Sequence, residues 1–118
     1  MDSILDTIKQ LLGISSDQTH FDTDIIVHIN RAISRLRRLG VGPAKGYRIT
    51  DRHGTWNDII QDSEKLEDVK TFVYLKVKLI FDPPLSSAAV TAMKEEVKEL
   101  EWELNVTAES TLDDEEEV

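Results

Sequence analysis

The chain has 118 residues, no cysteine and a formal net charge of −9, so it has the size of one domain and can form neither a disulfide nor a thiolate metal site. No apolar stretch approaches the ~20 residues that a membrane-spanning helix needs, and we expect no membrane partner. The negative charge disfavours binding to nucleic-acid phosphates, which depends on lysine and arginine.

Two helices are predicted in the first third of the chain. The first covers residues 4–12, because Ser3 can cap its start and Gly13 follows its last turn. The second covers residues 22–39. Asp22 is its predicted cap, and apolar residues recur at steps of three and four until Gly40.

The second helix carries three arginines on the face opposite its apolar stripe, namely Arg31, Arg35 and Arg38. Three roles stay open for them: a nucleic-acid patch, an ion-pairing surface for an acidic partner segment, or a solvent-exposed face with no partner. The overall charge and the lack of interleaved base-reading Asn or Gln argue against nucleic acid. The acidic end of the chain, which could reach a neighbouring copy, favours ion pairing.

Residues 41–61 lose the helical periodicity and are interrupted by glycine and proline. Strand-forming residues stand on both sides of residues 51–54, which predicts a β-hairpin-like or extended loop inserted between the second and third helices. We expect this insertion to project from the helical body. Its aromatic residues Tyr47 and Trp56 are then candidates for exposed contacts with another chain.

The third helix is predicted over residues 63–81, with Asp62 or Ser63 as its cap. Its apolar residues cover more than one face, which is typical of a central helix packed on two sides. Pro83 and Pro84 end it abruptly. A fourth helix follows over residues 87–104 with one apolar stripe, and Trp102 projects roughly opposite that stripe. We interpret Trp102 as a contact for another chain; a contact with this chain's own loop or tail is the alternative.

The sequence thus predicts an all-α fold of four helices with one insertion. Residues 1–104 form the predicted helical domain, and residues 105–118 form an acidic tail whose composition does not by itself support packing. The residues predicted to dock this tail onto a partner are Asp113, Asp114, Glu115, Glu116 and Glu117.

No pattern in the chain points to catalysis, a cofactor or a metal. Asp51, His53 and Asp58 are ordinary turn residues, and no base is aligned with a nucleophile. The glycines of residues 40–46 follow a helix instead of a strand, and no Ser or Thr follows a Gly-Lys pair, so a phosphate-binding loop is not indicated. We expect that the protein is not an enzyme.

Several short motifs, taken in their order, resemble the head-tail connector family of tailed bacteriophages over roughly residues 4–104. They are Phe21-Asp22, Ile29-Asn30-Arg31-Ala32, Leu39-Gly40-Val41-Gly42, Trp56, Phe81-Asp82-Pro83-Pro84 and Glu99-Leu-Glu-Trp-Glu-Leu104.

The resemblance implies a structural virion protein at the head-tail junction, present in the host cytoplasm during assembly. It implies a homo-oligomeric ring, dodecameric in the assembled neck, that sits beneath the portal protein and extends the DNA channel. The next neck or head-closure protein would dock on it, and DNA would pass without specific binding. In such relatives the loop between the second and third helices is suited to ring contacts, and the C-terminal segment reaches towards the portal.

Two other functions are carried as alternatives. A small DNA-binding regulator would use the arginine face of the second helix and would bind duplex DNA in a salt-sensitive way. A small interaction module would form no ring and would stay monomeric in the presence of a portal.

Overall fold

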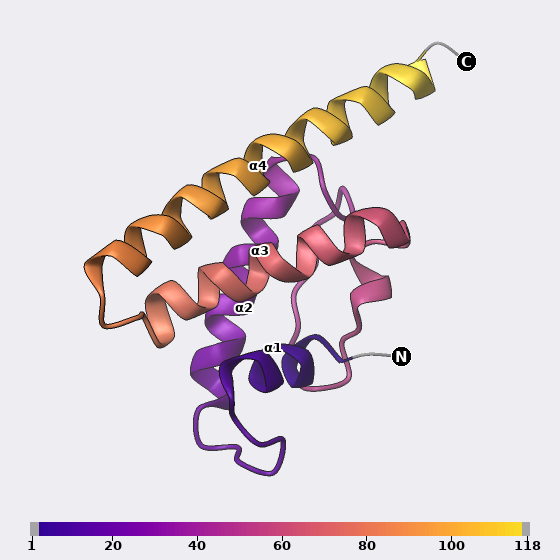
Figure 1. Ribbon diagram of the computed structural model, residues 1–118. Coiled ribbons are helices and arrows are strands. Elements are labelled where there is room, and N and C mark those ends of the chain that lie inside the picture. The colour runs from indigo at the N-terminus through magenta and orange to yellow at the C-terminus, as the bar shows by residue number, and fades with distance from the viewer. Residues whose placement is uncertain (1–2, 117–118) are drawn as a thin grey trace.

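The computed structural model describes the backbone of residues 3–116 and the side chains of residues 3–108. Its elements are α1 (Ile4–Leu12), α2 (Asp22–Arg38), the short 3₁₀ helix η1 (Trp56–Asp58), α3 (Ser63–Phe81) and α4 (Ser87–Glu116). Within the described residues there is no strand, only an isolated bridge between Ser3 and Thr55. The predicted all-α fold of four helices is confirmed (Figure 1).

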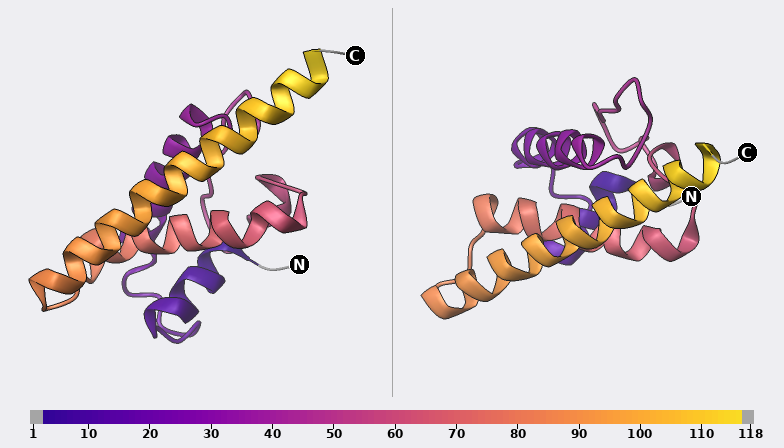
Figure 2. Two further views of the ribbon diagram at one scale, coloured as in Figure 1. Left: turned by 45° about the horizontal axis from the view of Figure 1, so that its top comes forward. Right: turned by 90° about the horizontal axis from the view of Figure 1, so that it is seen from above.

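Helix α3 is the centre of the fold. It packs against each of the other three helices, and Figures 1 and 2 show α2 and α4 crossing it while α1 lies beside it. Its buried residues Val69, Phe72, Val73, Leu75 and Val77 point in several directions around the helix. A helix that is apolar on more than one face must be covered on more than one side, so the predicted central position is confirmed.

The helix starts follow the sequence signals with one exception. The Ser3 side chain accepts a hydrogen bond from Asp6 N at 3.2 Å, and Asp62 accepts one from Glu64 N at 2.9 Å. The predicted cap at Asp22 is wrong: Phe21 occupies the cap position, and Asp22 is the first helical residue. The carboxylate of Asp22 pairs with Lys9 instead.

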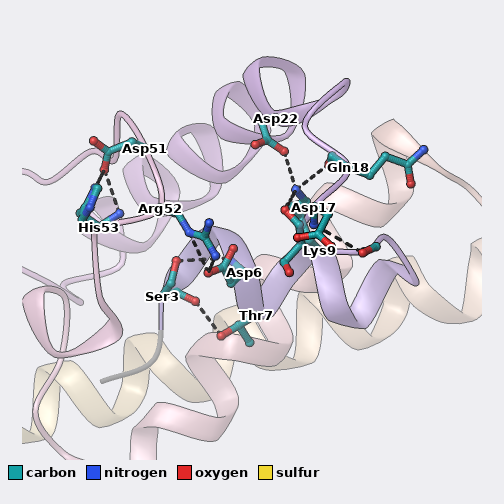
Figure 3. Close-up of polar contacts among 12 residues, drawn as sticks. Ser3, Asp6, Thr7, Lys9, Asp17, Gln18, Asp22, Asp51, Arg52 and His53 are labelled. Carbon is teal, nitrogen blue, oxygen red and sulfur yellow. Dashed lines mark hydrogen bonds and ion pairs between the residues drawn. The ribbon is translucent and has the colours of Figure 1, made fainter.

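Lys9 is an almost fully buried cation, with 1% of its side chain exposed. Its Nζ lies 2.8 Å from Asp22 Oδ1 and donates hydrogen bonds to Gln18 O at 2.7 Å and Ser16 O at 3.3 Å. Figure 3 shows this cluster, in which one ammonium group joins α1, the following loop and the start of α2. A buried charge is tolerated only when it is paired and hydrogen-bonded. Here Asp22 supplies the opposite charge, and two backbone carbonyls accept hydrogen bonds from the ammonium group.

The insertion of residues 41–61 is an irregular loop that contains η1, and no strands pair within it, so the β-hairpin alternative is wrong. The expectation that it projects is also wrong for its apolar residues Val41, Ile49, Trp56 and Ile59, which are buried in the core. Asn30 on α2 holds the loop in place: its amide donates to Ile49 O at 2.9 Å and accepts from Ile49 N at 2.8 Å. These two bonds satisfy a backbone that has no strand partner.

Helix α4 is longer than predicted and continues past residue 104 to Glu116. Ala108 extends the buried stripe of Val97, Leu100 and Leu104 by one more turn. It lies against Gly40, where a Cβ would come within 3.1 Å of the Ala108 Cβ. Gly40 also has φ +90°, a conformation that glycine adopts without strain. Residues 105–108 thus continue the packed helix, because Gly40 has no side chain and leaves room for Ala108.

We predict that Lys9→Met lowers the free energy of unfolding by about 2 kcal/mol, because Asp22 loses its ion-pair partner and two backbone carbonyls lose a charged hydrogen-bond donor. Urea denaturation followed by circular dichroism measures the change. Lys45→Met is the matched control: Lys45 is exposed in the loop, and its substitution should change stability by less than about 0.5 kcal/mol. Equal stability losses in the two variants would contradict the role given to the buried cation.

Candidate functional site

Trp102 is the largest exposed apolar side chain on α4. It is 67% exposed, whereas its neighbours Leu100 and Leu104 are 5% and 2% exposed. The helix therefore buries one stripe and presents the indole on another face, as the 100° spacing predicts. The contact with this chain's own loop, considered above as an alternative, does not cover the indole. Its part in an interface with another chain stays a prediction.

The arginine face of α2 is only partly free. Arg31 and Arg38 are exposed, but Arg35 forms a salt bridge with Glu101 on α4, with 3.0 Å between Nη2 and Oε2 and a second, longer bond of 3.4 Å from Nε. The hydrogen bond to Glu101 and the charge of that carboxylate raise the pKa of Arg35. One arginine of the row thus braces α2 against α4 within the same chain.

A basic hollow lies between α2, α3 and α4. Its first part, of about 260 Å³, is lined by α2 and the C-terminal half of α3. Its second part, of about 440 Å³, is lined by α3 and α4. Lys76 and Ile80 line both parts, so we call the whole depression the basic trough. Its charged residues are Arg31, Arg35, Arg38, Lys76, Lys94, Lys98 and Glu101.

The three trough lysines had no place in the sequence-based site. Lys94 and Lys98 follow one another at a four-residue step on α4, which places them on one helix face. Their spacing was a usable signal. Their meeting with Lys76 and the arginines depends on how α3 and α4 cross, which periodicity does not give.

Trp56 is not an exposed contact, and this prediction is wrong. It is 2% exposed, and its Nε1 donates a hydrogen bond to the Thr7 hydroxyl at 3.1 Å. Trp56 opens η1 instead of lying in a strand, and Ile4 N donates to Gly54 O at 3.0 Å beside it. The loop is thereby fastened to α1, which turns the indole into the core.

Tyr47 is half-buried and donates a hydrogen bond from its hydroxyl to Asp58 Oδ2 at 3.0 Å. Asp58 also accepts from the backbone and hydroxyl of Thr55. Burial, followed by the hydrogen bond and the charge of Asp58, raises the pKa of Tyr47 to about 12. The phenol therefore has a structural role within the chain, and a contact of Tyr47 with another chain stays a prediction.

The acidic residues of the predicted tail lie at the limit of the structure. The backbone of Asp113, Asp114, Glu115 and Glu116 belongs to α4, but their side chains, like Glu117 as a whole, lie outside the described residues. The division into residues 1–104 and a tail stays a prediction, although α4 crosses that boundary without a break.

The turn residues considered above for metal binding or catalysis serve local contacts in the described part of the chain. Among the described residues no three His, Cys, Asp or Glu side chains come together as a metal site. Asp51 contacts His53, while Asp58 serves Thr55 and Tyr47, so these turn residues hold loop geometry. None of the described helices has the length and hydropathy to cross a membrane.

The helical body, from α1 to beyond Ala108, is also the part of the chain that a known family matches. Residues 4–111 match the family described as phage connector protein. The chain belongs to this family. Neither the curated proteins nor the solved structures compared with it give a match. As a phage connector it has a structural part in a virus particle, which is compatible with the expectation that it is not an enzyme.

We predict that Tyr47 ionises near pH 12, measured by tyrosinate absorbance in a Tyr74→Phe background while circular dichroism monitors the fold. A pKa raised on folding stabilises the protein fully below the ordinary value of about 10, and this contribution is lost as the pH rises towards the folded value. Asp58→Asn removes the carboxylate and should lower the pKa of Tyr47. Titration near 10 in the folded chain would contradict the contact.

Proposed function

We propose that this phage connector is a head-tail adaptor that forms a ring beneath the portal protein. There it extends the DNA channel and offers a docking surface to the next neck protein. The observation that carries the proposal is the exposed Trp102 on α4 of a chain from a connector family. Large aromatic side chains dominate the energetics of protein interfaces, and a monomer gains nothing from holding an indole in water.

The ring proposal needs side surfaces that meet neighbouring copies. We assign Trp102 to such a surface and keep Tyr47, Arg31, Arg35 and Arg38 as further interface candidates, while Trp56 is withdrawn because it is buried. Arginines and aromatic residues are both enriched in interfaces. The pairing of Arg35 with Glu101 leaves Arg31 and Arg38 as the arginines with greater freedom to contact a neighbour.

The proposed site of action is the virion's head-tail junction, reached after assembly in the host cytoplasm. A channel wall must let DNA slide, and the net charge of −9 disfavours adhesion of the like-charged duplex. Residues 113–117 are all acidic and are proposed to dock on a basic surface of the portal or of a neighbouring copy.

Trp102→Ala is predicted to weaken attachment to the cognate portal while leaving the helix content unchanged, because the indole contributes to an interface and not to the core. Co-sedimentation with the portal measures attachment, and circular dichroism measures helicity. The change in stability should stay within about 0.5 kcal/mol, since Trp102 is exposed.

Two control variants sharpen this test. Trp56→Ala removes the buried tryptophan and should cost about 3–5 kcal/mol of stability. Leu11→Ala removes a half-exposed apolar residue of α1 and should leave attachment unchanged. A loss of helicity in Trp102→Ala, or full attachment of that variant, would contradict the proposed interface.

Deletion of residues 112–118 is predicted to reduce attachment to the portal or ring, because it removes the acidic run. A full-length variant with Asn and Gln at positions 113–117 serves as the control that keeps the length and removes the charge. It should lose attachment as the deletion does, with the difference from the unmodified chain shrinking at high salt. Attachment of the deletion variant that is unaltered at both low and high salt would remove the tail from the proposal.

A further inference from the structure

The basic trough concentrates positive charge on a protein that is acidic overall. It is lined by six of the chain's 14 lysines and arginines, but within the described residues by only one of its 23 acidic residues. That one, Glu101, is engaged by Arg35. Among the described side chains, Arg31, Lys94 and Lys98 have no hydrogen bond or ion pair. The trough therefore holds a surplus of cations without acidic partners.

The lining of the trough is partly apolar. Ile80 lines both parts of the trough and is 53% exposed, and Leu79 and Val97 add to the apolar lining between α3 and α4. A β-branched apolar residue that stays half-exposed between cationic walls suits a segment with acidic edges and an apolar contact. DNA would meet the cations, but its phosphates would gain nothing from the isoleucine.

We propose that the basic trough receives the acidic C-terminal segment of a neighbouring copy of the same chain. That segment is the run of five acidic residues at positions 113–117, which follows Leu112 directly in the sequence. Its carboxylates would pair with the trough arginines and lysines, and Leu112 would supply the apolar side chain for Ile80. Such charge complementarity sets the orientation and register of an interface.

The occupant must come from another copy, because α4 is continuous. Glu101, in the trough, and Asp113 belong to the same helix, and their separation of twelve residues corresponds to about 18 Å along the axis. A helix cannot fold back onto its own earlier turns. After Ala108, the last buried residue among the side chains that the structure describes, the backbone of α4 runs past the other helices (Figures 1 and 2), where a neighbour can meet it.

This contact is heterologous, since the end of α4 on one copy meets a different surface on the next. Repetition of a heterologous contact closes a ring when the rotation between copies allows it. The inference rests on the proposed ring and deepens it by naming both halves of one contact between subunits. It also separates this contact from attachment to the portal, which other surfaces can provide.

The absence of cysteine from the sequence allows a direct test by disulfide cross-linking. Two single-cysteine proteins, Lys98→Cys and Asp114→Cys, are mixed, assembled with the cognate portal and oxidised; their cross-link can join only different copies. We expect the Lys98–Asp114 link, identified by mass spectrometry. Lys45→Cys replaces a basic residue of the loop, outside the trough, and should not link to Asp114→Cys.

The possible outcomes distinguish a failure of the proposed trough contact from a failure of the proposed connector role. Assembly with the portal but without the trough link, or with Asp114→Cys linked to the portal instead, overturns this inference and leaves the proposed connector role intact. Failure of the unmodified chain to assemble with the portal overturns both. Salt-sensitive binding of duplex DNA that is lost in Lys94→Glu/Lys98→Glu would assign the trough to nucleic acid and overturn the inference.

A charge exchange gives a second, independent test. Lys94→Glu/Lys98→Glu and Asp113→Lys/Asp114→Lys should each weaken association between copies by about tenfold or more, because like charges then face one another. Combining the four substitutions in one chain should restore association. Lys45→Glu/Arg48→Glu makes the same change of charge outside the trough and should have no such effect. Additive losses in the combined variant would overturn the inference.

Discussion

The fold depends on one constraint: α3 is apolar on more than one face and has to be covered by the three other helices. Satisfying it uses the apolar stripes of α1, α2 and α4. Among the surfaces that stay exposed are the outer face of α4 with Trp102 and the basic trough beside the C-terminal half of α3. Surfaces that do not take part in covering the central helix are thus available to bind a partner.

The charges of the chain are divided in space as well as in sequence. Cations gather where α2, α3 and α4 meet, while the longest acidic run of the sequence begins at Asp113, close to the C-terminal end of α4. The net charge of the whole chain does not reveal this separation of positive and negative charge. A connector that is acidic overall can let DNA pass and still carry a local basic surface for an acidic segment.

Local spacing was enough to predict the helices, the central place of α3, a cap at Ser3, a cap at Asp62 or Ser63, and the exposure of Trp102. It failed for Trp56, whose burial is set by long-range contacts with α1. It failed for the end of α4, where Gly40 makes space for Ala108. Periodicity also failed to predict the burial of Lys9 and the clustering of the trough lysines. Both depend on how segments distant in sequence are brought together.

The central claim is that this phage connector assembles with a portal as several copies in a ring. The most direct measurement is the mass of the purified protein by light scattering, alone and mixed with its cognate portal, beside a duplex-DNA shift at low salt. The account predicts a ring alone, or a complex that contains the portal and multiple copies of the chain, with no DNA shift. A monomer that does not bind the portal and that slows the migration of duplex DNA in a salt-dependent way would contradict it.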